Sequence, residues 1–321
     1  MRSTHRYGRL VCLLALFFGL AVARVAGSAP QADELGAVRW ARSLDVALAE
    51  SGSSGRPVFA LFQEVPGCQT CVSFGEQVLS NPLLVEAIED EFVPLAIYNN
   101  RAGADRAALE RYGEPAWNNP VVRFLGSEGA DLIPRRQGVW APGQVAERMI
   151  AALEASARPV PSYLREAAYE LRDRLPGRAV VATHCYWEGE GCIGRLEGVV
   201  ATRAVWLEGR EAVEVTFDRE RTDYAKLLRS VQQAGCAHAV FAAREGERAA
   251  AEAVFGDAVI LSTAQPRPAG DSDQKRHLRH SPLGDLALSE LQAVRVNGAL
   301  WARQDPAAWL TPRQRARRVA P

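Results

Sequence analysis

The chain lacks a net charge, a dense set of cysteines and any internal repeat. Its 38 lysine and arginine residues are balanced by 38 aspartate and glutamate residues, which excludes a protein built around a broad basic surface for nucleic acid. Six cysteines in 321 residues are too few for a scaffold held together by disulfides. After residue 23, no run is apolar enough to span a membrane. What is present is an ordinary globular composition, 48% hydrophobic and 24% charged, with a length that allows about two domains.

The N-terminal residues are typical of an export signal. A basic start, Met1–Arg9, precedes the apolar run Leu10–Ala23, and small residues follow at 26–29. As a helix this run would extend about 21 Å, which is less than the roughly 30 Å hydrocarbon core of a membrane. We therefore expect a signal peptide at residues 1–28, with an uncleaved anchor as the alternative. The mature protein is then expected to be exported, periplasmic or extracellular, without stable insertion in a membrane.

Hydrophobic patterning predicts an α/β (α+β) fold in two domains. We place the first domain at residues 36–157 and the second at 178–312, with a linker and helix at 158–177 between them and a solvated basic tail at 313–321. The linker is marked by Arg158–Pro161, where two prolines interrupt both helix and sheet. Strands are expected at 57–62, 92–98, 121–125, 131–133, 179–183, 199–207 and 212–218, and the helix of the linker is expected at 162–175.

Export changes what the cysteines can do. Without Cys12, which lies in the signal peptide, five cysteines remain in the mature chain. Thiols outside the cytosol tend to be oxidised, so some pairs are expected to form disulfides. Because five is odd, at least one thiol is left over for chemistry or exchange. The five residues are Cys68, Cys71, Cys185, Cys192 and Cys236.

Cys68 and Cys71 form a C-x-x-C pair directly after a predicted buried strand and at the start of a predicted helix. The helix dipole and the free backbone N–H groups stabilise a thiolate at the first cysteine, and a residue three positions on faces the same side. Cys68 is therefore expected to be the attacking thiolate and Cys71 the resolving thiol. A static disulfide and half of a zinc site are the alternatives.

The surroundings of this pair resemble a known family. Residues 39–157 resemble a thioredoxin-like domain, and Val65–Thr70 closely resembles a bacterial thioredoxin-like (seleno)protein family of the VPGUxT type, marked by Val-Pro-Gly, selenocysteine or cysteine, any residue and threonine. The resemblance implies that Cys68 occupies the selenocysteine position and is the more nucleophilic thiol. It also implies that Pro120 lies where such folds place a cis-proline beside the active site, in contact with substrate. The tryptophan that usually precedes the pair is absent.

Cys185 marks a second candidate site. The predicted strand at 179–183 runs into it, so a helix start again favours its thiolate. Tyr186 and Trp187 follow directly, and two aromatic side chains beside a thiol predict an apolar wall for a small methyl-bearing group.

The residues around Cys185 also resemble a known family, peptide methionine sulfoxide reductase A. The resemblance implies that Cys185 attacks the sulfur of a sulfoxide, Glu211 protonates the departing oxygen, and Tyr186 and Trp187 hold the methyl group. The product at the thiol is a sulfenic acid, which a second thiol reduces through a disulfide. The segments that carry the resemblance are His184–Glu188, Glu211–Asp218 and Tyr224–Leu228, with a weaker likeness at Gln274–Pro282.

The second domain also departs from that family. The family's longer loop, with its substrate-binding tyrosine, has no counterpart between Val205 and Glu211. The glycines on either side of the family's Cys-Phe-Trp are replaced by His184 and Glu188. The alternative is therefore a domain that keeps the fold and the nucleophile but acts on a different substrate.

Cys236 is expected to be the thiol that resolves Cys185. Cys192 lies seven residues after Cys185, so a helix would separate them by about 10.5 Å, whereas a disulfide needs Cα atoms within about 7 Å. Cys236 lies in a glycine-containing connection after a predicted helix at 223–233 and is free to approach. The alternative is a static bridge between Cys192 and Cys236, which leaves Cys185 to be reduced directly by Cys68.

Two further patterns do not predict a cofactor or a metal. Residues 189–194 match G-x-G-x-x-G, but they lie inside the stretch that must be helical for Cys185 to cap it. Cys236 and His238 lack a spacing that is diagnostic of zinc. We therefore expect chemistry that relies on thiols alone.

The sequence as a whole predicts an exported oxidoreductase that acts on sulfur groups. We expect Cys185 to reduce methionine sulfoxide, free or in peptides, and the Cys68/Cys71 pair to recycle it, because a tether raises the effective concentration of a partner. The expected partners are an oxidised protein or a small sulfoxide or disulfide as substrate, and an upstream thiol reductant. The alternatives are a thioredoxin-like protein disulfide reductase or isomerase whose second domain has lost sulfoxide activity, and a non-catalytic module with structural disulfides.

Overall fold

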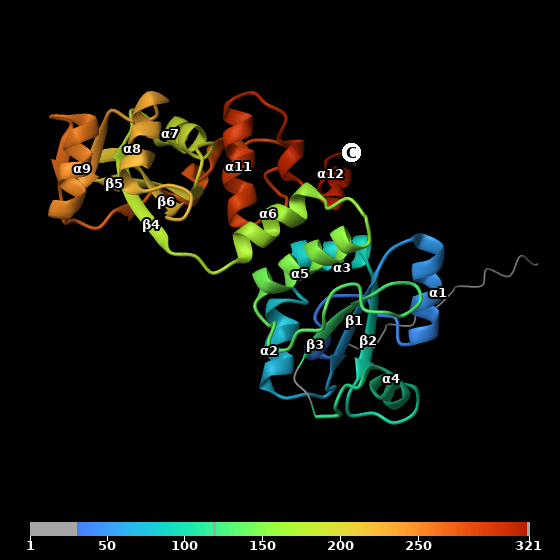
Figure 1. The fold of residues 1–321 in the computed structure, drawn as a ribbon. Coiled ribbons are helices and arrows are strands. Elements are labelled where there is room, and N and C mark those ends of the chain that lie inside the picture. The colour runs from blue at the N-terminus through green and yellow to red at the C-terminus, as the bar shows by residue number, and fades with distance from the viewer. Residues whose placement is uncertain (1–30, 118–119, 320–321) are drawn as a thin grey trace, which may run out of the picture. The chain divides into compact units, whose positions relative to one another are not determined.

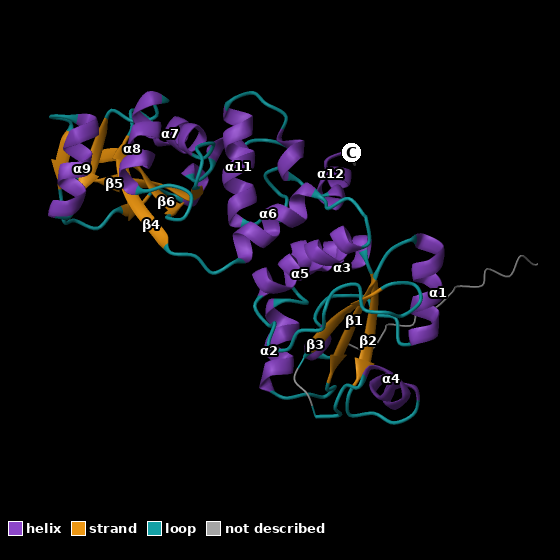
Figure 2. Ribbon diagram, in the orientation of Figure 1, coloured by secondary structure: helices purple, strands orange, loops and turns teal. Residues whose placement is uncertain are grey.

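The fold is known from a computed structural model, which describes residues 31–117 and 120–319 (Figure 1). The expected signal peptide, residues 1–28, lies outside the described residues. Within these residues, no helix is both long enough and apolar enough to cross a membrane. The described residues form a mixed α/β structure with two sheets, one of three strands and one of six (Figure 2).

The first sheet has the strand order β2–β1–β3. β1 (Val58–Gln63) runs parallel to β2 (Val93–Tyr98) and antiparallel to β3 (Val121–Leu125). Every residue of β1 is buried, as its apolar run predicts, with Phe59 and Leu61 in one core and the alternating side chains in another. α3 and α5 contribute to the first core, and α1 and α4 to the second. These elements are η1 (Asp33–Leu35), α1 (Leu44–Ser54), α2 (Gln69–Gln77), α3 (Pro82–Glu91), α4 (Ala104–Tyr112) and α5 (Pro142–Ala155).

The strand predicted at residues 131–133 does not form. An isolated bridge joins Leu125 to Asp131, and the Leu132 N–H donates to the Phe124 carbonyl at 2.8 Å. The pairing stops there because Pro134 has no N–H with which to continue the ladder.

The second sheet has the strand order β8–β7–β4–β6–β5–β9, and all neighbours are antiparallel except β7 and β8. α7, α8 and α11 pack on it around Val181, Val213 and Val215. The strands are β4 (Pro176–Ala182), β5 (Val199–Leu207), β6 (Arg210–Asp218), β7 (Ala239–Ala242), β8 (Val259–Leu261) and β9 (Arg267–Pro268). The other elements are α7 (Tyr186–Ile193), α8 (Tyr224–Gln233), α9 (Glu245–Phe255), η2 (Asp271–Asp273), α10 (Arg276–Arg279), α11 (Glu290–Trp301) and η3 (Pro306–Trp309).

The segment before the second sheet differs from its prediction. α6 (Ser162–Leu171) ends at Leu171 instead of residue 175, and β4 begins at Pro176 instead of residue 179. Gly177 pairs with Phe217 of β6, and a Cβ on this glycine would lie 2.1 Å from the Phe217 ring. The Pro-Gly sequence therefore begins a strand here, because the missing side chain leaves room for the ring.

The expected basic tail is helical as far as residue 319, where it forms α12 (Pro312–Val319). The Arg313 guanidinium pairs with Glu89 at 2.9 Å and with Asp90, and its backbone N–H donates to Glu86 at 2.9 Å. Glu89 and Asp90 lie three and four residues after Glu86, so all three acids lie on one side of α3. Arg313 thus binds acidic residues more than 220 positions earlier in the chain, which the sequence around it does not reveal.

Candidate functional site

The first thiol pair lies at the start of α2. Cys68 is the N-cap residue of this helix and Cys71 belongs to its first turn, which confirms the helix start predicted after the buried strand. Cys68 is exposed and Cys71 is buried, and their Sγ atoms are 3.7 Å apart. The two thiols are therefore close enough to form a disulfide after a small movement.

The surroundings give the two thiols opposite acidities. Backbone N–H groups at the helix start, that of Cys71 first, stabilise the thiolate and lower the pKa of Cys68. Burial, together with the contact to Cys68, raises the pKa of Cys71 to about 11. At neutral pH the exposed Cys68 is therefore the better source of a thiolate, while Cys71 remains a protonated thiol.

The loop before Cys68 is held by hydrogen bonds to two side chains that the sequence pattern does not single out. Glu34, buried in η1, accepts a hydrogen bond from the Gly67 N–H at 2.6 Å. Asn100 accepts a hydrogen bond from the Val65 N–H at 3.3 Å and donates one to the Pro66 carbonyl at 3.0 Å. The Val65–Pro66 peptide bond is cis. The sequence offered no signal that links Glu34 or Asn100 to the cysteines.

Gly67 has no room for a side chain. A Cβ at this position would lie 2.5 Å from the Glu64 carbonyl oxygen, 2.7 Å from the Cys71 Cβ and 2.9 Å from the Cys71 Sγ. The glycine of the Val-Pro-Gly segment therefore lets the backbone pass directly against the buried thiol.

Pro120 is buried, and its carbonyl accepts a hydrogen bond from the Trp140 indole N–H at 3.0 Å. Asn119, which precedes it, lies outside the described residues. A contact between Pro120 and a substrate at Cys68 therefore stays a prediction.

The second candidate site lies where β4 leads into α7. Cys185 is the N-cap residue of α7 and a half-buried free thiol. Glu211, on the neighbouring strand β6, accepts a hydrogen bond from the Tyr186 N–H at 2.8 Å through its carboxylate and one from the Thr183 N–H at 3.0 Å through its carbonyl. The fold thus brings the expected nucleophile and the expected acid to the same helix start.

The two expected aromatic residues differ in exposure. Tyr186 is buried and packs edge-on against Trp187 and Trp206, with ring centroids 6.0 and 5.7 Å apart. Trp187 is half-buried. Trp187 is therefore better placed than Tyr186 to contact a ligand. Tyr186 packs against the Trp187 ring from the protein interior.

Two further residues, which the sequence pattern does not single out, lie against the Trp187 side chain. Asp273 accepts a hydrogen bond from the Trp187 indole N–H at 3.1 Å, and burial together with the charge of Asp273 raises the pKa of Tyr186. The Arg276 guanidinium lies 3.8 Å from the centre of the Trp187 ring. The weak likeness at Gln274–Pro282, which begins one residue after Asp273, was the one available signal.

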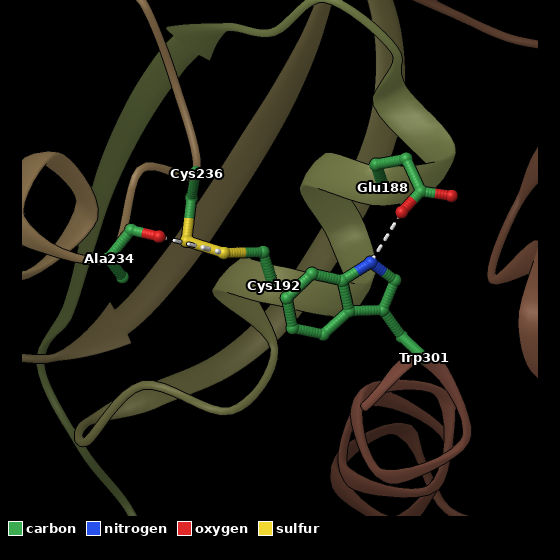
Figure 3. Close-up of a disulfide and its surroundings, with 5 residues drawn as sticks. All are labelled: Glu188, Cys192, Ala234, Cys236 and Trp301. Carbon is green, nitrogen blue, oxygen red and sulfur yellow. Dashed lines mark hydrogen bonds between the residues drawn. A yellow bond between two sulfur atoms is a disulfide. The ribbon is translucent and has the colours of Figure 1, made fainter. Parts of the chain in front are cut away.

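Cys192 and Cys236 form a disulfide with an S–S distance of 2.02 Å and a Cα–Cα distance of 5.6 Å (Figure 3). In the structure Cys236 is therefore bonded to Cys192, the pairing named as the alternative, and is not a free thiol. The reason is that α7 is helical through Ile193, which carries Cys192 two turns away from Cys185 and toward the connection between α8 and β7. In Figure 3, Trp301 of α11 lies beside the bridge.

The segments that carry Cys185 and Cys236 nevertheless run side by side. β4 and β7 are antiparallel neighbours, paired up to Ala182–Ala239. Beyond that pair, the rings of His184 and His238 stack with centroids 4.3 Å apart. His184 directly precedes Cys185 and His238 lies two residues after Cys236, so this stacking brings the two segments together.

The G-x-G-x-x-G match at residues 189–194 covers the second half of α7 and its C-cap Gly194, and its glycines allow close packing. A Cβ on Gly189 would lie 2.6 Å from the Thr183 side chain, and one on Gly191 would lie 2.4 Å from the Trp301 ring. The glycines therefore let α7 approach the sheet and α11 closely. In the part of the chain that the structure describes, histidine, cysteine and acidic side chains do not gather in groups of three or more that could hold a metal ion.

Comparisons with known proteins match parts of the chain. A family model described as Thioredoxin-like matches residues 39–127. The peptide methionine sulfoxide reductase MsrA of Streptomyces coelicolor is 42% identical over 64 residues, which cover 16% of this chain and 37% of that protein. The MsrA of Nocardia farcinica is 39% identical over 64 residues, which cover 16% of this chain and 38% of that protein.

The chain thus spans less than two fifths of the length of these two relatives. Among solved structures, a DsbH oxidoreductase is 17% identical, with a TM-score of 0.32, over 37% of this chain and 88% of that one. Together, the family match, the β2–β1–β3 sheet and the cysteine at the start of α2 show that residues 39–127 form a thioredoxin-like domain at the N-terminal side of a mixed α/β chain.

Proposed function

We propose that the protein is a thiol–disulfide oxidoreductase in which Cys185 reduces methionine sulfoxide and the Cys68/Cys71 pair returns electrons to it. The observation that carries the proposal is the free Cys185 thiol at a helix start, with the Glu211 carboxylate bound to the next backbone N–H. The partial identity to two MsrA proteins supports it.

In the proposed sulfoxide reduction, one side chain acts as the nucleophile and another as the proton donor. The Cys185 thiolate attacks the sulfoxide sulfur, while Glu211 donates a proton to the sulfoxide oxygen. The sulfur–oxygen bond breaks to leave a thioether, and the two electrons come from Cys185, which becomes a sulfenic acid. Trp187 offers the apolar surface for the methyl group beside the thiol.

The sulfenic acid is then resolved by the other two cysteines of this domain. The Cys236 thiol attacks the Cys185 sulfenic acid, which releases water and forms a disulfide between them. The Cys192 thiolate attacks the Cys236 sulfur and releases the Cys185 thiol. The pairing of β4 with β7 and the stacked rings of His184 and His238 support the first step, and the Cys192–Cys236 bridge supports the second as its product. The structure then corresponds to the oxidised end of the cycle.

The Cys68/Cys71 pair reduces this bridge. The Cys68 thiolate attacks one of its sulfur atoms to form a mixed disulfide, and Cys71 resolves that disulfide and leaves a Cys68–Cys71 bond, which an upstream thiol reductant reduces. The lowered pKa of Cys68 and the raised pKa of Cys71 suit these roles. We place this cycle outside the cytosol, with oxidised proteins or small sulfoxides and disulfides as substrates, and assign the first domain to the cysteine form of the VPGUxT type.

Turnover of the separated epimers of methionine sulfoxide, with dithiothreitol as reductant, tests the proposal. We expect reduction of the S epimer alone, its loss in Cys185→Ser, and its retention in Cys71→Ser, because dithiothreitol bypasses the pair. Peptide mapping after one equivalent of sulfoxide should find a Cys185–Cys236 link in Cys192→Ser. A Cys185–Cys192 link in the parent would overturn the order of the relay, and failure to reduce either epimer would overturn the sulfoxide activity.

One observation favours a second function. β5 and β6 are joined by a two-residue turn, Glu208-Gly209, in which both residues have positive φ, 48° and 71°. A longer substrate loop between Val205 and Glu211 is therefore excluded. A thiol without that loop fits disulfide exchange with protein substrates. Reduction of a protein disulfide that depends on Cys185, without turnover of either sulfoxide epimer, would select this function.

A further inference from the structure

A guanidinium lies on the aromatic wall beside Cys185. Arg276, the first residue of α10, has its guanidinium carbon 3.8 Å from the centre of the Trp187 ring. Trp187 follows Cys185 by two residues, in the first turn of α7. The aromatic residues after the thiol therefore carry a guanidinium on one ring, in addition to the Asp273 carboxylate at its indole N–H, whereas the sequence predicted a purely apolar surface.

The Arg276 guanidinium has no hydrogen-bond acceptor and no ion-pair partner within residues 31–117 and 120–319. The nearby acids, in contrast, already have donors. Asp273 accepts a hydrogen bond from the Trp187 indole at 3.1 Å, and Glu188 accepts one from the Trp301 indole at 2.6 Å. The N–H groups of Arg276 are therefore available to an acceptor from outside the chain.

The backbone that carries Arg276 is firmly held. The Lys275 N–H donates to the carboxylate of Glu190, a fully buried residue of α7, at 2.6 Å. The Gln274 amide accepts from the Ala204 N–H at 3.0 Å and donates to the Ala204 carbonyl at 2.9 Å, on β5. These contacts tie the start of α10 to both α7 and the sheet. The residue whose guanidinium stacks on Trp187 is thus held by its neighbours in the chain.

We propose that Arg276 is an anion-binding residue of the Cys185 site, and that the site prefers small sulfoxides with a free carboxylate to the same group inside a peptide. A guanidinium stacked on an indole keeps its edge N–H groups free for a two-bonded contact with a carboxylate. In free methionine sulfoxide, three carbon atoms separate the sulfur from the carboxylate, so both can be held by one small site. The identity of the substrate rests on the proposed function, but the anion subsite does not.

Alkylation of Cys185 tests the subsite without any sulfoxide. In the full chain carrying Cys68→Ser and Cys71→Ser, the rates of Cys185 alkylation by anionic iodoacetate and by neutral iodoacetamide can be compared by mass spectrometry. Arg276→Met should lower the iodoacetate rate about tenfold and leave the iodoacetamide rate within about twofold. Arg279→Met, which removes an exposed cation of the same helix, should change neither rate. An unchanged ratio in Arg276→Met would overturn the subsite.

Turnover then tests the substrate class. The parent should have a higher kcat/KM for methionine sulfoxide than for its amide, in which the carboxylate is replaced. Arg276→Met should lower kcat/KM about tenfold or more for the acid and leave the amide unchanged. Equal losses on both substrates would overturn the carboxylate preference. Turnover of neither substrate, with the iodoacetate preference intact, would overturn the sulfoxide function and support the anion subsite.

Discussion

Replacing Gly67 by alanine should disable the first thiol pair. The added Cβ would lie 2.5 Å from the Glu64 carbonyl oxygen and 2.9 Å from the Cys71 Sγ, closer than side-chain carbons approach such atoms. The first of these atoms belongs to the backbone and the second is buried, so neither can move without a wider rearrangement. Overpacking of this kind costs about 1–3 kcal/mol.

The same displacement should slow disulfide exchange. The Cys68 and Cys71 sulfur atoms, 3.7 Å apart, must approach to about 2.0 Å as their bond forms. If about 1.4 kcal/mol of the steric cost falls on this step, resolution of a mixed disulfide slows about tenfold. The free energy of unfolding and the exchange rate are therefore expected to fall together.

Urea unfolding of the reduced protein measures the first effect, and stopped-flow reduction of a small disulfide measures the second. Gly52→Ala is the matched control, because a Cβ there would meet only Ser127, at 3.8 Å, and the residue lies within α1. Alanine in a helix is about 0.5–1 kcal/mol more stable than glycine, so this control should gain stability and keep its exchange rate. A Gly67→Ala protein as stable and as fast as the parent would refute the steric reasoning.

Four further predictions concern the thiols of the two candidate sites and the acidic side chains beside Cys185. Iodoacetamide should modify Cys68 below the pH range in which an ordinary cysteine reacts and Cys71 only as the pH nears about 11, because the first pKa is lowered and the second is raised to about 11. Mass spectrometry across the pH range checks the order, and earlier reaction of Cys71 would contradict it. Cys68→Ser should abolish disulfide exchange and Cys71→Ser should trap mixed disulfides on Cys68; mapping of traps to Cys71 on non-reducing gels would reverse the roles. Glu211→Gln should lower sulfoxide turnover about 100-fold, as for a lost general acid, while the Tyr186 N–H keeps an acceptor and Cys185 still alkylates; unchanged turnover would make the reductase resemblance purely structural. Asp273→Asn should lower sulfoxide turnover about tenfold by weakening the hold on the Trp187 indole, and an equal loss in the exposed control Asp271→Asn would remove Asp273 from the site.

Cys68 and Cys185 could both be placed from the sequence because their signals are local. Each follows a strand and precedes a helix, and such short-range patterns need no knowledge of tertiary packing. Glu211 could be placed only through a family resemblance, since a single glutamate in an alternating strand is otherwise ordinary.

The partners of these residues could not be placed, because they come from distant segments. Glu34 and Gly67 are 33 residues apart, and Asp273 and Trp187 are 86 residues apart. Spacing left two arrangements open for Cys236, and only the packing of α7 beside the connection between α8 and β7 decides between them. Arg276 lies in a polar stretch that has no periodicity, so only its stacking on an indole reveals it.

The Glu34 carboxylate, which holds the Gly67 N–H, lies before the stretch that defines the thioredoxin-like domain, residues 39–127. A recombinant fragment cut at that boundary would lack the contact, and its thiol reactivity would report the truncation instead of the native pair. Cleavage after Glu34 would remove this hydrogen bond and leave Asn100 to hold the loop before Cys68, with both cysteines in place.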